Sequence, residues 1–198
     1  MSVYQVTPPP DLSTREENFV TWENAFSLEE LSLIRKIGDN LAIGEGTIGG
    51  ETSTTDTEVR QSKVGWIACT GETQFIYDRL GYVLRMINGE YFNFDMYGFV
   101  EDFQYTVYTS NSDHYSWHID KGNLNSSPRK ISMVLQLSDP SEYEGGELEF
   151  QFGPSPTVAQ KKQGKIHAFP SWILHRVTPV TRGTRKTLVI WAAGPKFR

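Results

Sequence analysis

The chain has 198 residues, a formal net charge of -5 and a sequence pI of about 5.4, so it is long enough for one domain with a substantial core. The acidic balance argues against nucleic acid as a partner, because contact with a phosphate backbone depends on clustered Lys and Arg. Cys69 is the one cysteine of the sequence, which excludes an intrachain disulfide and favours a reducing compartment.

The amino-terminal segment carries no pattern for an anchor or for regular structure. It lacks a basic stretch followed by an apolar run, and a run of about 18 apolar residues occurs nowhere, so we expect a cytoplasmic protein. Three consecutive prolines at positions 8–10 disfavour regular structure. Residues 1–20 are therefore predicted to form an arm over the domain, and residues 21–198 to form that single domain.

Two amphipathic helices are predicted in the first half of the chain. Ser27 and Glu30 have the spacing of a capping box, and apolar residues then recur at helical spacing until Gly38. A second helix is predicted from about Thr70 to the stop at Asn88. Its apolar stripe has a period of about 3.6 and consists of Phe75, Ile76, Leu80, Val83, Leu84 and Ile87. Both helices should pack against a sheet.

The segment between these helices has a different composition. Residues 44–57 are rich in Gly, Thr and Ser and contain few large apolar side chains, so they can add little to a core. We expect this segment to act as a mobile lid.

From about residue 97 the pattern changes to short strands bounded by turn residues. The predicted strands are residues 103–108, 115–120, 131–137, 147–152, 165–169, 174–179 and 185–191. Short strands at this spacing are typical of a sandwich or jelly roll. The expected fold class is mainly β with flanking helices, in which the N-terminal helices pack on the major sheet and the jelly-roll core covers about 97–195.

Two separated motifs can supply ligands to one metal ion. His118 and Asp120 are two positions apart, so on an extended strand both side chains point to the same face, while Ile119 points to the other. A distant strand must then supply His175. Two imidazoles and one carboxylate on one face of a six-coordinate ion leave the opposite positions open, which is the arrangement of non-haem Fe(II) oxygenases. The pattern therefore predicts an enzyme.

Further motifs surround these ligands in a fixed order: Tyr108 ten residues before His118, segments 143–148 and 164–170, and segment 175–185 with Arg185 at its end. Over roughly residues 55–195 the sequence resembles the Fe(II)- and 2-oxoglutarate-dependent dioxygenases of the prolyl 4-hydroxylase-like group. The resemblance implies a double-stranded β-helix in which His118, Asp120 and His175 hold iron at the open end.

The resemblance also implies a site for 2-oxoglutarate as cosubstrate. Its 1-carboxylate and keto oxygen can chelate iron, and its 5-carboxylate then needs a buried cation. Arg185 suits this task, because its planar fork binds a carboxylate through two hydrogen bonds. In some relatives the cation is lysine, but strand alternation sends Lys186 and Arg185 to opposite faces, and the family offset matches Arg185.

Three other positions are assigned to the cosubstrate pocket by the same resemblance. Gln136 stands where some prolyl hydroxylases have a tyrosine that helps to hold the 5-carboxylate, and its amide can also donate a hydrogen bond. Tyr108 matches a position that lines the pocket. Trp191 matches an aromatic residue of the pocket wall and shares a strand face with Arg185.

Several residues allow both a structural and a functional interpretation. Arg60 begins an Arg-x-Ser segment that resembles one near the substrate entrance of procollagen-type hydroxylases, and Trp172 is either a core residue or faces the substrate. The glycines at 145–146 are expected to form a tight turn. His114 follows a turn sequence and His167 matches no ligand position of the family, so both are expected to be structural or rim residues.

The resemblance implies hydroxylation of an unactivated C–H bond, with O2 as oxidant, ascorbate as the expected reductant, and conversion of 2-oxoglutarate to succinate and CO2. The expected substrate is a proline in a peptide or protein. A free amino acid or another small metabolite is the alternative, because the metal-binding motif does not indicate which substrate is bound. A nucleobase dealkylase is disfavoured, because its additional Arg pattern and a basic surface are missing. A non-catalytic metal-binding or sugar-binding jelly roll would not need Arg185.

Overall fold

The computed structural model describes residues 17–48, 55–122 and 128–196. Most of the predicted arm and the middle of the predicted lid lie outside these ranges. The described end of the arm enters strand β1 (Val20–Trp22), and the described start of the lid forms strand β2 (Gly44–Glu45).

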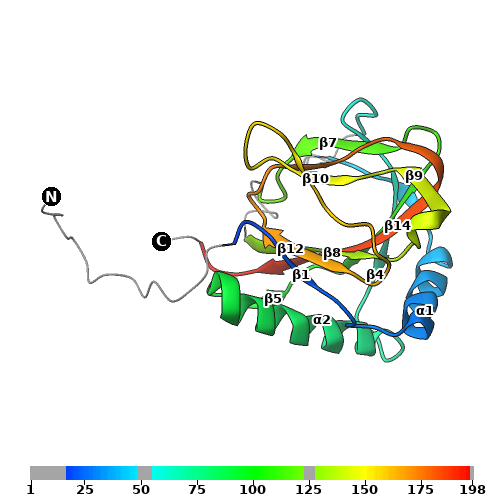
Figure 1. Cartoon of the computed structure of the whole chain (residues 1–198). Helices are drawn as coiled ribbons and strands as arrows, with labels where there is room; N and C mark the ends of the chain where they lie inside the picture. The colour runs from blue at the N-terminus through cyan, green and yellow to red at the C-terminus, as the bar shows by residue number, and fades with distance from the viewer. Residues whose placement is uncertain (1–16, 49–54, 123–127, 197–198) are drawn as a thin grey trace, which may run out of the picture.

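Two antiparallel sheets, one above the other, make up most of the domain (Figure 1). The larger sheet contains, in order, β1, β12 (Ile166–Pro170), β8 (Arg129–Gln136), β14 (Val180–Ala193), β6 (Phe103–Thr109), β4 (Lys63–Ile67) and β2; β5 (Gly98–Phe99) and β9 (Tyr143–Gly145) also pair with β14. The smaller sheet contains, in order, β11 (Thr157–Val158), β10 (Leu148–Phe150), β13 (His175–Val177), β7 (His114–His118) and β3 (Arg60–Gln61). The expected fold class, mainly β with flanking helices, is confirmed.

Both predicted helices are present and lie outside the sandwich. Helix α1 (Leu28–Asp39) begins with the predicted capping box, in which the Glu30 amide donates to Ser27 Oγ over 3.2 Å and the Ser27 amide donates to Glu30 Oε2 over 2.8 Å. Helix α2 (Gln74–Ile87) starts later than predicted, because the Thr70 amide donates to Thr73 Oγ1 in a preceding turn. Within the described ranges, neither helix has the length and apolar character needed to cross a bilayer.

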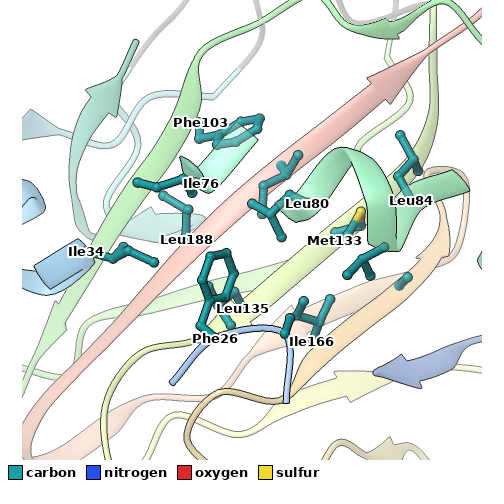
Figure 2. Close-up of a cluster of buried hydrophobic side chains, with 14 of the residues drawn as sticks. Phe26, Ile34, Ile76, Leu80, Leu84, Phe103, Met133, Leu135, Ile166 and Leu188 are labelled. Carbon is teal, nitrogen blue, oxygen red and sulfur yellow. The ribbon is translucent and has the colours of Figure 1, made fainter. Parts of the chain in front are cut away.

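The main hydrophobic core lies between these helices and the larger sheet. Figure 2 shows its side chains converging from both helices, from the strands and from the turn before α1: Phe26, Ile34, Ile76, Leu80, Leu84, Phe103, Met133, Leu135, Ile166 and Leu188. Burial of this continuous apolar surface is the principal stabilising contribution to the fold.

Strand alternation sends a second set of side chains into the space between the two sheets. On β8, Met133 and Leu135 face the helices, whereas Val134 joins a smaller core cluster between the sheets. On β14, Leu188 and Ile190 face the helices, while the alternating residues Thr187, Val189 and Trp191 turn inward. This inner face positions the candidate active site.

Candidate active site

Three potential metal ligands come together at one end of two neighbouring inner strands of the smaller sheet, β7 and β13. His118 ends β7 and His175 begins β13, and the two residues are directly paired in the ladder between these strands. Asp120 lies with them: its Oδ1 is 3.6 Å from His118 Nε2, and its Oδ2 is 3.6 Å from His175 Nε2. The three ligand atoms all lie within 4.8 Å of one another. The predicted convergence of these residues is therefore present.

The way in which Asp120 reaches this position differs from the prediction. The strand ends at His118, so Asp120 is not the next inward residue of an extended segment. Instead, its backbone amide donates to the Ser171 carbonyl over 2.9 Å, and this hydrogen bond fixes the bend after β7. A loop contact therefore replaces the expected strand geometry.

Neighbouring groups orient all three ligands. His118 Nδ1 lies 2.8 Å from the Ser116 carbonyl oxygen, and His175 Nδ1 lies 2.8 Å from the Ile173 carbonyl oxygen. A carbonyl can only accept, so each Nδ1 carries the proton and each Nε2 presents a lone pair to the shared space. The Ser132 hydroxyl donates to Asp120 Oδ2 over 2.7 Å, which holds the carboxylate in place.

The protonation states suit a divalent cation. Burial, assisted by the neighbouring His175, lowers the pKa of His118 to about 3, so its imidazole is neutral at neutral pH. Burial opposes ionisation of Asp120, but His175, His118 and the hydrogen bond from Ser132 outweigh it and lower the pKa of Asp120 to about 2. The carboxylate is therefore charged. This donor set fits Fe(II) in type and number.

A cavity of about 880 Å³ opens between the sheets and contains the three ligands in its wall. Arg185 lies in the same wall and is 1% exposed. Its guanidinium Cζ lies 5.4 Å from the centre of the Tyr108 ring, and one terminal nitrogen is 3.4 Å from Gln136 Oε1. Among the residues that the structure describes, no carboxylate pairs with Arg185, and its Nε has no hydrogen-bond partner. A buried cation in this state fits an anionic ligand such as a dicarboxylate.

Lys186 is on the opposite side of the sheet, as strand alternation predicts. Its Nζ lies 2.7 Å from Asp39 Oδ1, at the end of helix α1. This lysine is therefore neutralised on the helix-covered side, and Arg185 is the cation of the pair that faces the cavity.

The other predicted cosubstrate residues surround Arg185 to different degrees. Tyr108 and Trp191 line the cavity. Gln136 is buried, and its Oε1 accepts the long hydrogen bond from Arg185. Their proposed roles in holding a cosubstrate remain predictions.

The two residues predicted near the substrate have different surroundings. Arg60 lines the cavity but is buried, and it donates to Ser62 Oγ, to the Thr47 carbonyl and to Gln104 Oε1 over 2.9, 3.0 and 2.9 Å. Trp172 is 40% exposed, and its ring lies 5.4 Å from the Phe94 ring. A role in substrate binding remains a prediction for both.

The remaining histidines have backbone partners, as expected for structural residues. The two ring nitrogens of His114 lie 2.9 Å from the Ser112 carbonyl and 3.1 Å from the Glu58 carbonyl. His167 is fully buried, and its Nε2 lies 2.9 Å from the Gln160 carbonyl. Neither belongs to the ligand cluster.

Sequence reasoning missed two residues beside the site, Tyr115 and Arg129. The Tyr115 ring stacks on the His118 ring with 3.5 Å between centroids, and the guanidinium of Arg129 lies 3.6 Å from the centre of the Trp191 ring. The position of Tyr115 three residues before His118 gave a weak signal, since a strand bend is needed to bring them together. No local pattern indicated the position of Arg129, because its partner Trp191 is distant in the sequence.

The glycine pair at 145–146 does more than form a turn. Both residues have positive φ, +73° and +62°, which favours glycine. A Cβ on Gly145 would lie 2.1 Å from the Pro179 carbonyl oxygen, and a Cβ on Gly146 would lie 2.9 Å from Arg185 Cδ. The pair therefore also makes room for the arginine of the cavity.

Comparison with known proteins is consistent with this geometry. Residues 103–193 match a family model described as the 2OG-Fe(II) oxygenase superfamily. A PKHD-type hydroxylase of Teredinibacter turnerae (strain ATCC 39867 / T7901) is 41% identical over 86 residues, which are 41% of this chain and 38% of the relative. Another, from Synechococcus sp. (strain CC9902), is 40% identical over 79 residues, which are 40% of this chain and 36% of the relative. The matches thus span less than two fifths of the length of these curated relatives.

Solved structures share the fold over most of the chain. A prolyl hydroxylase from Trichoplax adhaerens, solved with a peptide fragment of the hypoxia inducible factor oxygen degradation domain, superimposes with a TM-score of 0.71 at 16% identity, covering 89% of this chain and 83% of that one. A viral collagen prolyl hydroxylase from Paramecium Bursaria Chlorella virus-1, in its 2OG complex, gives 0.68 at 21% identity, covering 90% and 97%. At these identities the likeness establishes the double-stranded β-helix fold.

Proposed function

We propose that this chain is an Fe(II)- and 2-oxoglutarate-dependent dioxygenase that hydroxylates a C–H bond, because residues 103–193 match the family model of the 2OG-Fe(II) oxygenase superfamily. One juxtaposition supports the proposal most directly. Three ligands of the type that holds Fe(II) and one buried arginine without a carboxylate partner among the described residues line the same cavity. A site for a metal alone would have no use for Arg185, whereas a metal-chelating dicarboxylate uses both.

Some residues of the site would bind the metal, and others would orient the groups around it. Nε2 of His118, Nε2 of His175 and a carboxylate oxygen of Asp120 would hold Fe(II). With 2-oxoglutarate bound, Fe(II) supplies the oxidising chemistry that places one atom of O2 in the substrate and the other in succinate, with release of CO2. Ser132 keeps the Asp120 carboxylate in place, and Arg185 orients the diacid through its distal carboxylate.

For the substrate, we propose a proline in a peptide or protein. Structures with this fold include prolyl hydroxylases, one of them solved with a peptide fragment. Trp66 and Ile119 are 45% and 47% exposed and line the cavity, so apolar surface is available at its rim for a pyrrolidine ring and its neighbours. Ascorbate as reductant, the cytoplasmic location and the absence of a nucleic-acid partner remain predictions.

The test is turnover by the full chain with Fe(II), ascorbate, O2 and 2-oxoglutarate. We expect succinate formation that increases with a Pro-containing peptide, together with a peptide product one oxygen atom heavier in mass spectrometry. His118→Ala should form no succinate. His114→Ala is the matched control and should retain turnover, because this histidine contacts only backbone carbonyls away from the ligand cluster.

The possible outcomes separate the two parts of the proposal. Failure of the Fe(II)-loaded wild type to form succinate with every peptide and amino acid offered would refute the dioxygenase activity. Turnover with free amino acids and none with peptides would retain that activity and refute the peptide substrate.

A further inference from the structure

The buried end of the cavity around Arg185 has more hydrogen-bond donors than acceptors. A guanidinium carries five N–H groups, and among the described residues the acceptor recorded for Arg185 is Gln136 Oε1 at 3.4 Å. The Nε–H group has no partner at all. Because an unpaired buried donor costs free energy, this excess indicates that a ligand rich in acceptors completes the site.

Tyr143 adds another unpaired donor next to this group. It lies on β9, is 3% exposed, and its buried hydroxyl has no hydrogen-bond partner among the described residues. The Tyr143 and Arg185 side chains flank the same glycine: a Cβ on Gly146 would lie 2.9 Å from Arg185 Cδ and 3.5 Å from Tyr143 Cε2. The phenol therefore lies near the arginine side chain.

The phenol is a donor under ordinary conditions. Burial raises the pKa of Tyr143 above its usual value, even though the charge of Arg185 and the approach of its guanidinium to the phenol oxygen act in the opposite direction. Arg185 could donate to the phenol oxygen, but the hydroxyl hydrogen would then still lack an acceptor. A carboxylate can accept from both groups, since its two oxygens offer about four lone-pair sites.

The backbone of β9 places Tyr143 specifically at this point. Tyr143 pairs with Gly183 of β14, two residues before Arg185, and the following glycines turn the chain back with positive φ. The phenol therefore approaches Arg185 from a strand other than β8. On β8, Gln136 occupies the place at which some relatives have a tyrosine, and it presents its acceptor oxygen to Arg185.

We propose that the Tyr143 hydroxyl donates a hydrogen bond to the distal carboxylate of the 2-oxo acid, together with Arg185. This inference rests on the proposed function, because it takes 2-oxoglutarate as the ligand of the cavity. It assigns to β9 the hydroxyl donor that Gln136 does not supply from β8. If the phenol were only a core side chain, phenylalanine would serve equally well.

The experiment compares two acids that differ only in the distal group. Isothermal titration calorimetry of the Mn(II)-loaded full chain gives the Kd of 2-oxoglutarate and of 2-oxopentanoate, which has the same carbon chain without the second carboxylate. Mn(II) keeps the oxygen and nitrogen preference of the site without supporting turnover. For Tyr143→Phe we expect 2-oxoglutarate to bind about 10- to 100-fold more weakly, as for loss of a hydrogen bond to a charged group, and 2-oxopentanoate to bind as in wild type.

Tyr105→Phe is the matched control. Tyr105 is fully buried on the helix-covered side of the larger sheet, and its hydroxyl donates to Asp39 Oδ1 over 2.6 Å. This variant loses a buried tyrosine hydroxyl away from the cavity, so both Kd values should stay at the wild-type level. The ratio of the two Kd values within one variant is also insensitive to partial unfolding, since both acids titrate the same folded protein.

One result would overturn the assignment of Tyr143: a ratio of the two Kd values in Tyr143→Phe that equals the wild-type ratio. If both Kd values then match wild type, the hydroxyl does not contribute to binding, and if both are raised by the same factor, its role is purely structural. A wild-type protein without any preference for 2-oxoglutarate would be a different result, because it would refute the proposed function together with this inference.

Discussion

The two faces of the larger sheet differ in how well their buried polar groups are paired. On the helix-covered face, apolar side chains from α1, α2 and the strands fill the space, and the buried Tyr105 hydroxyl has Asp39 as its partner. On the face toward the smaller sheet, Arg185 Nε, Trp191 Nε1 and the Tyr143 hydroxyl are buried without a partner among the described residues. The first face stabilises the fold, and the second keeps hydrogen-bonding capacity for a ligand.

The largest expected effect comes from a substitution that removes a ligand from the cavity face and leaves the helix-covered face of the sheet intact. Asp120→Ala removes the one anionic ligand, so we expect succinate formation to fall below detection and Mn(II) binding to be lost. The thermal unfolding midpoint of the metal-free protein should change little, because Asp120 is held by Ser132 and the bend rather than by the main core. Calorimetry measures the binding of Mn(II), and circular dichroism measures the unfolding midpoint. Succinate formation that persists in the variant would contradict the ligand assignment.

The reverse experiment weakens the core on the helix-covered face and leaves the cavity unchanged. Leu80 is fully buried in the centre of the helix–sheet core, and Leu80→Ala should lower the free energy of unfolding by about 2–5 kcal/mol, as for other large-to-small core substitutions. Urea unfolding followed by circular dichroism gives this value. The Kd of 2-oxoglutarate at low temperature, where the variant is folded, should match wild type. A marked change in that Kd would show that the two faces are not independent.

Arg185→Met sharpens the comparison at a single residue of the second face. The substitution keeps an unbranched chain but removes the charge, so we expect 2-oxoglutarate to bind at least about 30-fold more weakly, since its distal carboxylate loses a buried charged partner. Without ligand, the unfolding midpoint should rise, because Met avoids burying a cation that has no counter-ion among the described residues. A fall in that midpoint would mean that Arg185 stabilises the free fold.

The smallest expected effect concerns the surface. Hydrogen bonds from Lys162 and Lys165 lower the pKa of Glu23 from 4.5 to about 2. A carboxyl group with a lowered pKa stabilises the fold above pH 4.5, and this contribution is lost as the pH falls towards 2. Urea midpoints of wild type and Glu23→Gln should therefore differ slightly near neutral pH and converge in acid. A difference that grows as the pH falls would contradict the assigned pairing.

Local patterns in the sequence predict much of the fold and the chemically central residues. The capping box at Ser27 and the apolar stripe of α2 identify the helices, because each of these signals is made by residues that are close together in the sequence. The spacing of His118 and Asp120 predicts that both side chains reach one site, and the family resemblance adds His175 and Arg185 to it. The separation of Arg185 from Lys186 follows from strand alternation alone.

Features that depend on pairing between distant strands were not predictable in this way. The ladder between β9 and β14 places Tyr143 beside Arg185, and nothing in the local sequence gives that register. The bend that holds Asp120 depends on a hydrogen bond to Ser171, which is distant in the chain. Two of the hydrogen-bond partners of Arg60, Thr47 and Gln104, come from other segments of the chain.

Strand β14 has a consequence for folding. It pairs with β6, β8 and β9 and presents Arg185 to the cavity and Lys186 to Asp39. A slip of one residue along these neighbours would exchange the two cations, so that Lys186 would face the cavity and Arg185 would be buried under the helices. The register that β14 adopts during folding therefore determines which of the two cations faces the cavity.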